Sequence, residues 1–188
     1  MKPLKLFMLM LGCTPKGRHT EQHDVYFTIA SSIADTVPGI LAFWPEANGK
    51  IHIDAWREVT QLDNMAVEVI SKDDQDDQLA QPTKLFFINL GGYKEGEFDE
   101  FHYKLVLVAP DKAAAIKQAK ESAFYKHTRF RGAESHVDDK FGVDVDDFYQ
   151  IQDILPVEIK EKYALRLTTS KIESADELHL GYFQLNNL

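Results

Sequence analysis

The chain is poor in cysteine and has no long hydrophobic run. Its one cysteine, Cys13, excludes an intramolecular disulfide framework and is typical of a protein from a reducing compartment. A membrane-spanning helix needs a run of about 18 apolar residues, and the sequence contains none. We therefore expect a cytoplasmic protein with no membrane as a partner.

Basic residues are also scarce. The 188 residues include 21 Lys and Arg against 30 Asp and Glu, which leaves a formal charge of −9. Because binding to nucleic acid phosphates requires a basic face, we expect no nucleic acid partner. Hydrophobic residues make up 44% of the chain and charged residues 27%, which is typical of a globular protein rather than a disordered one.

Two common ligand-binding motifs are missing. The turns at Gly12 and Gly91 could offer backbone N–H groups to an anion, but neither is followed directly by a helix or by a Lys-Ser/Thr pair. The acidic run 138–147 lacks the glycine and glutamate spacing of an EF-hand, so we interpret it as solvated turns. Neither a phosphate loop nor a calcium loop is predicted.

The sequence does contain an internal repeat. Residues 6–30 match residues 85–109 without a gap, with eight identities in 25 positions; unrelated segments would share about two. The repeated residues include Gly12 and Gly91, Gly17 and Gly96, Glu21 and Glu100, and His23 and His102. Further along, the pair His52 and Asp54 matches His136 and Asp138 at a slightly larger offset. The pattern indicates a tandem duplication.

Each half has the hydrophobic pattern of a β-β-α-β-β unit. Short apolar runs and alternating segments predict strands, and helices should follow Ser32, where Pro38-Gly39 shortens or kinks the helix, and Asp111. The predicted strands are 5–11, 22–30, 50–59, 65–70, 84–90, 101–109, 136–143, 148–154 and 163–168, with a terminal strand near 178–184. Residues 50–59 and 65–70 should form a hairpin.

These elements predict an α+β protein in which two duplicated halves pack with pseudo-two-fold symmetry. A unit of about 70 residues buries only a modest core, so we expect the halves to pack together. The predicted organisation is a first repeat unit at 1–70, an acidic linker at 71–83, a second unit at 84–156, and C-terminal strands at 157–188 that complete the second unit. A homodimer would bury further surface.

The duplicated polar residues are the best candidates for a functional site. They form four pairs with i, i+2 spacing, which on a strand places both side chains on one face. The candidate residues are Glu21, His23, His52, Asp54, Glu100, His102, His136 and Asp138, together with the loop glycines Gly12, Gly17, Gly91 and Gly96. Imidazole and carboxylate groups so arranged could converge on Zn, Mn or Fe, or act as general bases.

The same pairs also have a structural interpretation. A histidine paired with a carboxylate at the start of a buried strand often ties a loop to the sheet. We favour this interpretation and assign no metal or other cofactor. The leading hypothesis is a non-catalytic protein that binds a small ligand or a protein partner. The alternative is a metal-dependent hydrolase or isomerase, and whether the protein is an enzyme stays open.

The repeated motifs resemble a known family. Leu-Gly-Cys, Glu-x-His-Asp and His-Ile-Asp-Ala-Trp-Arg-Glu-Val in the first half, with Leu-Gly-Gly-Tyr and His-Val-Asp-Asp in the second, are similar to the bacterial family catalogued as domain of unknown function 1543. The resemblance spans about residues 5–155 and implies one or two copies of the unit. It implies no activity, cofactor or catalytic residue. Cys13 departs from the Gly-Gly that is usual in the family.

Overall fold

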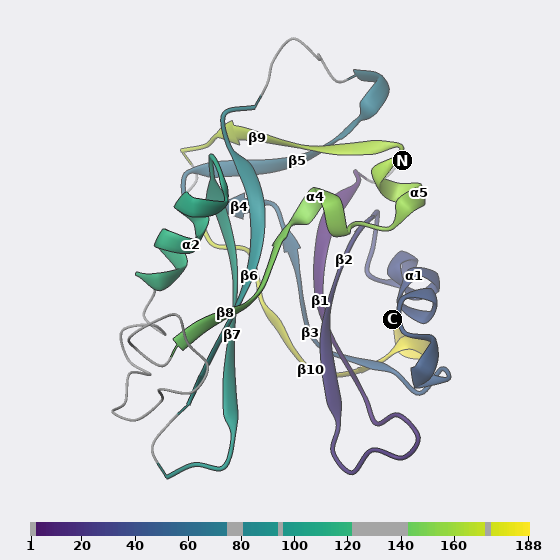
Figure 1. Ribbon diagram of the computed structural model, residues 1–188. Helices are drawn as coiled ribbons and strands as arrows, with labels where there is room; N and C mark the ends of the chain where they lie inside the picture. The colour runs from purple at the N-terminus through teal and green to yellow at the C-terminus, as the bar shows by residue number, and fades with distance from the viewer. Residues whose placement is uncertain (1–2, 75–80, 94–95, 122–142, 172–173) are drawn as a thin grey trace. The chain divides into compact units, whose positions relative to one another are not determined.

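The computed structural model describes residues 3–74, 81–93, 96–121, 143–171 and 174–188. The chain divides into two compact units: residues 1–79 with 154–188 form the first, and residues 80–153 form the second. Strands predominate and the helices are short (Figure 1). The protein therefore has the α+β fold class that the sequence predicts.

The first unit is built on a four-stranded antiparallel sheet in the order β10-β3-β1-β2. Its strands are β1 Lys5–Cys13, β2 Gln22–Ala30, β3 His52–Val59 and β10 His179–Gln184. Strand β1 lies between β2 and β3, so it is covered along both edges. This position explains why its sequence is apolar almost throughout.

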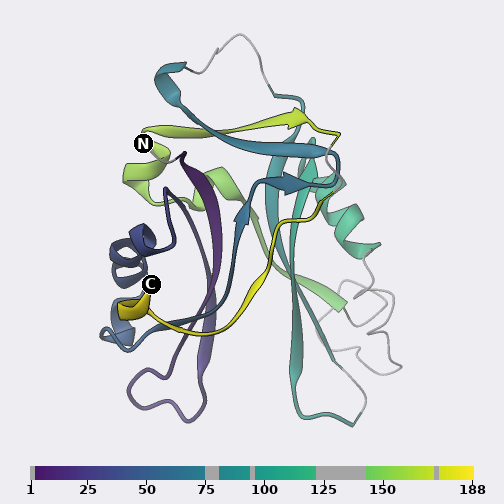
Figure 2. The ribbon, with the colours of Figure 1, turned by 180° about the vertical axis from the view of Figure 1, so that it is seen from behind.

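One face of this sheet carries the core of the first unit. Phe7, Leu9 and Leu11 of β1 are fully buried and pack with Ile40 of the helix α1, Val37–Phe43. Leu185, in the C-terminal turn η4 Leu185–Asn187, packs against the same cluster. Figure 2 shows α1 and this turn beside one another. The other face of β1 carries Gly12 and is the face on which the candidate site forms.

The helix after β2 is short, as predicted. A 3₁₀ turn, η1 Ala34–Thr36, precedes α1, and Ser32 Oγ donates a hydrogen bond of 2.7 Å to Asp35 Oδ2. Pro38 lies in the first turn of α1, where its missing N–H has no helical partner to lose. Another 3₁₀ turn, η2 Pro45–Ala47, leads into β3.

The predicted hairpin of residues 50–59 and 65–70 is wrong. After Thr60 the chain leaves the first sheet and forms a second, three-stranded sheet in the order β4-β5-β9. Its strands are β4 Gln61–Leu62, β5 Met65–Ser71 and β9 Tyr163–Thr169, and the turn η3 Lys72–Asp74 follows β5. Strand β5 pairs with β9 along its whole length, over the seven positions from Met65 to Ser71. Strand β3 therefore does not pair with β5, and its free edge pairs with β10 instead.

The C-terminal strands belong to the first unit, not to the second. Strand β9 pairs with β5, and β10 pairs with β3 (Figures 1 and 2). The prediction that residues 157–188 complete the second unit is therefore wrong. The physical reason is that β3 and β5 each have an open edge that no nearby segment covers, and Phe183 of β10 also packs against the first core. The short helices α4 Ile151–Ile154 and α5 Val157–Lys160 precede β9.

The described part of the second unit contains a three-stranded antiparallel sheet in the order β7-β6-β8 and a helix that packs on it. The elements are β6 Lys84–Tyr93, β7 Glu100–Ala109, α2 Lys112–Lys120 and β8 Val143–Gln150. Asp111 caps α2 by accepting a 2.9 Å hydrogen bond from the N–H of Ala114. Ala115 and Ala119 of the helix pack on Phe86, Ile88 and Leu90 of β6.

Candidate functional site

In the first unit, four predicted residues meet above Gly12. Gly12 of β1 is in register with His23 of β2 on one side and with His52 of β3 on the other. A Cβ atom at Gly12 would come within 2.5 Å of Asp54 Oδ2 and 2.6 Å of His52 Nε2. The missing side chain therefore makes the space in which the histidines and carboxylates approach each other.

A bulge in β3 brings Asp54 into this space. Met10 pairs with Ala55 and Leu11 pairs with Ile53, so Asp54 is an extra residue without a partner in β1. A bulge of this kind redirects a side chain and is common beside functional sites. Here it keeps Asp54 on the same face as His52 while the flanking residues keep their pairing.

The contacts link all four side chains in a ring. His52 Nε2 lies 3.1 Å from Glu21 Oε1 and 3.1 Å from Asp54 Oδ1. His23 Nε2 lies 3.5 Å from Glu21 Oε2 and 3.3 Å from Asp54 Oδ2. Each imidazole thus faces both carboxylates, and each carboxylate faces both imidazoles. The four predicted residues of the first half form one cluster, which we call the first-unit cluster.

The cluster has a buried side and an open side. The side chain of His52 is only 8% exposed, and its ring lies against that of Tyr182, with centroids 4.1 Å apart. The side chains of His23 and Glu21 are 44% and 42% exposed. An ion or small molecule from solvent could therefore reach the cluster from the side of β2.

Two buried atoms of the cluster make no hydrogen bond. His52 Nε2 and Asp54 Oδ2 have no hydrogen-bond partner among the residues that the structure describes, although oxygens or nitrogens lie 3.1 to 3.3 Å away. Buried polar atoms are nearly always hydrogen-bonded, so such exceptions call for an explanation. The donor set of two imidazoles and two carboxylates is one that Zn, Mn and Fe accept.

The second unit holds a smaller cluster. Glu100, His102 and Asp146 each offer a ligand atom, and these atoms lie within 4.8 Å of one another. His102 Nδ1 is 3.2 Å from Asp146 Oδ2, and His102 Nε2 is 4.0 Å from Glu100 Oε2. Asn89 joins it, because its Nδ2 lies 3.3 Å from His102 Nδ1. We call Glu100, His102 and Asp146 the second-unit cluster.

The second-unit cluster is built like the first. Gly91 of β6 is in register with His102, and a Cβ at Gly91 would overlap the carboxylate of Asp146. Asp146 is the extra residue of a bulge in β8, because Leu90 pairs with Val145 and Asn89 pairs with Asp147. Gly12 and Gly91 thus serve to make room for a carboxylate, rather than to hold an anion.

Two predicted site residues of the second half cannot be assigned to either cluster. His136 and Asp138 fall within 122–142, outside the described residues. In the β6–β8 register, the residue opposite Gly91 is Asp144, where the first unit has His52 opposite Gly12. The loop glycines Gly17 and Gly96 have φ of +84° and +80° and lie in the turns after β1 and β6, away from side chains. They shape turns and take no part in either cluster.

Sequence reasoning missed Asp146, Asn89 and Tyr182. Asp146 lies in the acidic run for which solvated turns are predicted, and a bulge has no local signature there. Asn89 had a visible signal, because it is the one polar residue of the apolar run 85–90. Tyr182 is brought to His52 only by the pairing of β10 with β3.

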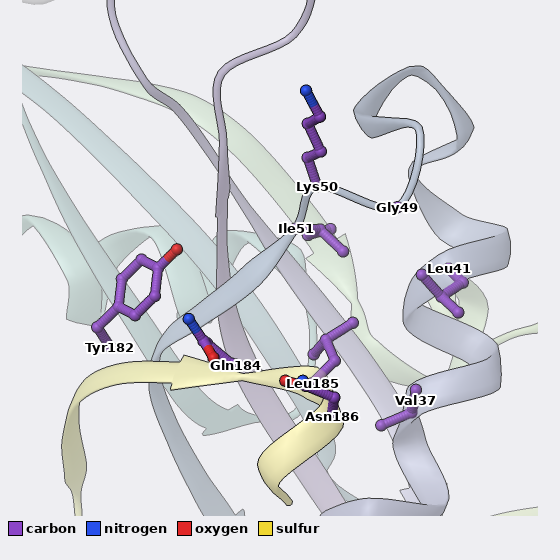
Figure 3. Close-up of a pocket in the computed structure, with 9 residues that line it drawn as sticks. All are labelled: Val37, Leu41, Gly49, Lys50, Ile51, Tyr182, Gln184, Leu185 and Asn186. Carbon is purple, nitrogen blue, oxygen red and sulfur yellow. The ribbon is translucent and has the colours of Figure 1, made fainter.

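A pocket of about 720 Å³ lies in the first unit (Figure 3). Helix α1 contributes Val37 and Leu41, and the C-terminal segment contributes Leu185 and Tyr182. Lys50 adds a positive charge at the rim. Because Tyr182 also contacts His52, the pocket and the first-unit cluster share one aromatic side chain.

Cys13 takes no part in the chemistry of the cluster, although it follows Gly12. Its side chain is 1% exposed and packs in the first core. Burial raises the pKa of the Cys13 thiol, and the negative charge of Glu21 raises it further. A thiol in this environment is a poor nucleophile.

Comparisons with known proteins match part of the chain to a family. Residues 18–69 match the family described as Domain of Unknown Function (DUF1543). This segment contains all four residues of the first-unit cluster, and the match supports the resemblance drawn from the sequence. No curated protein matches the chain. Among the helices that the structure describes, none has the length and apolar character needed to cross a membrane.

The fold is also found among solved structures. The crystal structure of a protein, Il1583, from Idiomarina loihiensis is similar with a TM-score of 0.56 and 19% sequence identity, and the similarity covers 97% of each chain. At this level of identity the likeness concerns the fold alone. The comparisons therefore assign no activity, and the function of the protein is unknown.

Proposed function

We propose that the first unit binds a divalent transition-metal ion, Zn²⁺ or Mn²⁺, through Glu21, His23, His52 and Asp54. The observation that carries this proposal is the position of His52 Nε2. It is buried, lies 3.1 Å from an oxygen of each carboxylate, and makes a hydrogen bond with neither. A ring nitrogen that lies between two carboxylate oxygens without a hydrogen bond to either is the arrangement that a shared cation requires.

The structural interpretation accounts for this geometry less well. A histidine that ties a loop to a sheet donates its N–H in line with one carboxylate oxygen. In the first-unit cluster two carboxylates converge instead on two imidazoles, and the described part of the chain places no Lys or Arg in ion-pair contact with either carboxylate. Two carboxylates that share the same pair of imidazoles repel one another, and a bound cation would turn that repulsion into attraction.

The open side of the cluster gives the proposed ion access to solvent. Because His23 and Glu21 are partly exposed, a water or a substrate atom could occupy a further coordination position there. Such a position is a requirement for metal catalysis, but binding alone is proposed here. Binding of a small ligand or a protein partner stays a prediction, and the pocket of Figure 3 is where we expect a small ligand in the first unit.

The experiment compares His23→Ala with His19→Ala. His19 is an exposed histidine in the loop before β2 and is absent from the contacts of the cluster. Protein made without an affinity tag is stripped with chelator and titrated with Zn²⁺ and Mn²⁺ by calorimetry, with thermal unfolding measured in parallel. We expect His19→Ala to bind one ion per first-unit cluster as the native protein does, and His23→Ala to bind at least about tenfold more weakly.

The same two variants separate the metal role from a purely structural one. The His23 side chain is 44% exposed, so in chelator His23→Ala should unfold within about 0.5 kcal/mol of the native protein. If the native protein binds neither ion, or if His23→Ala is strongly destabilised in chelator while its metal affinity is unchanged, the cluster is structural and the proposal is refuted.

We also propose that the two units arose by duplication. Support comes from three shared features: a strand glycine in register with a histidine, a glutamate two residues before that histidine, and a bulged aspartate over the glycine. These features involve Gly12, His23 and Asp54 in one unit and Gly91, His102 and Asp146 in the other. The cytoplasmic location and the homodimer stay predictions.

A further inference from the structure

We propose that the second unit has its own divalent-cation site, formed by Glu100, His102 and Asp146, which takes a harder ion than the first. The three ligand atoms lie within 4.8 Å of one another, close enough to bind one ion together. The proposal depends on these residues alone, so it holds or fails separately from metal binding by the first unit.

The polar groups around His102 support a cation at this place. His102 Nδ1 lies 3.3 Å from Asn89 Nδ2, a donor, and 3.2 Å from Asp146 Oδ2, an acceptor. A neutral ring nitrogen can accept from the first or donate to the second, but it cannot do both. If Nδ1 accepts from Asn89, the Asp146 oxygen lies 3.2 Å from a nitrogen that has no proton to donate to it, and a cation beside them relieves that contact.

Asn89 supplies a second, independent observation. The residue is 8% exposed, and its Oδ1 is buried without a hydrogen-bond partner in the part of the chain that the structure describes. Its Nδ2 donates to Asp147 Oδ2 at 3.1 Å, which holds the amide in place. The same amide contacts the cluster through Nδ2, 3.3 Å from His102 Nδ1, so a buried polar group without a partner belongs to a residue in direct contact with the proposed site.

The donor set favours a harder ion than that of the first-unit cluster. Among the described residues, the second-unit cluster offers one imidazole and two carboxylates, where the first-unit cluster offers two of each. Asp144 of β8 has the register position that His52 has in the first unit. Oxygen-rich sets suit Mn²⁺ and Mg²⁺, whereas a second imidazole favours Zn²⁺. The side chains of Glu100, His102 and Asp146 are 42%, 37% and 28% exposed, so the ion could keep several of its waters, as Mg²⁺ does.

The test uses Mn²⁺ as the probe, in full-length protein whose first-unit cluster has been disabled by Glu21→Gln. Electron paramagnetic resonance counts free and bound Mn²⁺. In this background we expect one Mn²⁺ to remain bound per chain. Adding Glu100→Gln should weaken its binding by about tenfold or more, whereas adding Asp99→Asn, which changes an exposed acid next to Glu100, should leave it within about twofold.

Two outcomes overturn the proposal: no bound Mn²⁺ in the Glu21→Gln protein, or equal binding with and without Glu100→Gln. A measurement on the native protein covers the case of a misfolded variant, because substoichiometric Mn²⁺ should broaden the imidazole NMR signals of His102. Unchanged His102 signals would overturn the proposal. If Glu21→Gln retains Mn²⁺ while the native protein binds no ion at the first-unit cluster, the proposed function fails and this inference stands.

Discussion

Replacing Gly12 by alanine tests the geometry of the first-unit cluster most directly. The new Cβ would lie 2.5 Å from Asp54 Oδ2 and 2.6 Å from His52 Nε2, and each atom must move by about 0.8 to 0.9 Å to reach ordinary contact. Metal–ligand distances tolerate only about 0.2 Å. Because two of the four ligands are displaced, we expect zinc affinity to fall by about a hundredfold.

The expected effect on stability follows by mass action. At a zinc concentration about 100 times the dissociation constant, binding stabilises the native protein by about 2.7 kcal/mol. A hundredfold weaker site would gain only about 0.4 kcal/mol at the same concentration. Urea unfolding with and without zinc, followed by circular dichroism, measures this difference. In the absence of zinc, overpacking should cost Gly12→Ala about 1 to 3 kcal/mol.

Gly17→Ala is the matched control. Gly17 has φ of +84°, and a methyl group added there would have no atom within 4 Å, so the variant should lose about 1 kcal/mol through backbone strain alone. It should keep the full zinc stabilisation. If Gly12→Ala gains as much stability from zinc as Gly17→Ala does, the four side chains above Gly12 are not the zinc ligands.

Two further predictions concern the rest of the first unit. Cys13 should react with a thiol reagent at pH 8 on the order of a hundredfold more slowly in the native protein than in urea, since it must first be exposed by opening; rapid labelling of the folded chain would contradict its burial. Folding raises the pKa of this thiol, so its contribution to the free energy of unfolding is present below the ordinary thiol pKa and decreases as the pH rises above it. Urea unfolding between pH 7 and pH 10, in steps of about one unit, measures this decrease. Asp176→Ala should lower the free energy of unfolding by about 2 kcal/mol. Asp176 accepts hydrogen bonds from the N–H groups of Thr60 and Gln61 and from Thr60 Oγ1, and so holds the segment before β10 against the turn after β3. Glu177→Ala, an exposed neighbour, should be nearly neutral, and equal stability of the two variants would show that this anchor is unimportant.

Much of the first-unit cluster could be predicted from local sequence. The i, i+2 spacing of Glu21 and His23, and of His52 and Asp54, places each pair on one face of a strand whatever the rest of the chain does. That the two pairs meet depends on β1, whose apolar run is typical of a strand buried on both faces, and on Gly12, which the repeat matches with Gly91. The bulge that turns Asp54 over Gly12 could not be predicted, because it is a property of the pairing between β1 and β3.

In the second half, the pairing of the strands brings to the cluster a residue that matching by sequence did not select. An offset of 84 makes His136 and Asp138 resemble His52 and Asp54, whereas the register of β8 on β6 brings Asp146 to the cluster. Short motifs of two residues recur by chance, and an acidic run offers several equivalent alignments. Only the hydrogen-bonded register distinguishes them, since a shift of one residue moves every side chain to the opposite face.

The sequence by itself determined the α+β class, the strands β1, β2, β6 and β7, and the residue types that could bind an ion, because hydrophobic alternation and repetition are local properties that need no partner. The tertiary structure decided that β9 and β10 return to the first unit, that Tyr182 lies on His52, and that Asp146 joins His102. These features depend on which strand edges remain open after the local pairs have formed. The β10 strand lies more than a hundred residues beyond β3, and neither segment has a sequence pattern that predicts pairing with the other.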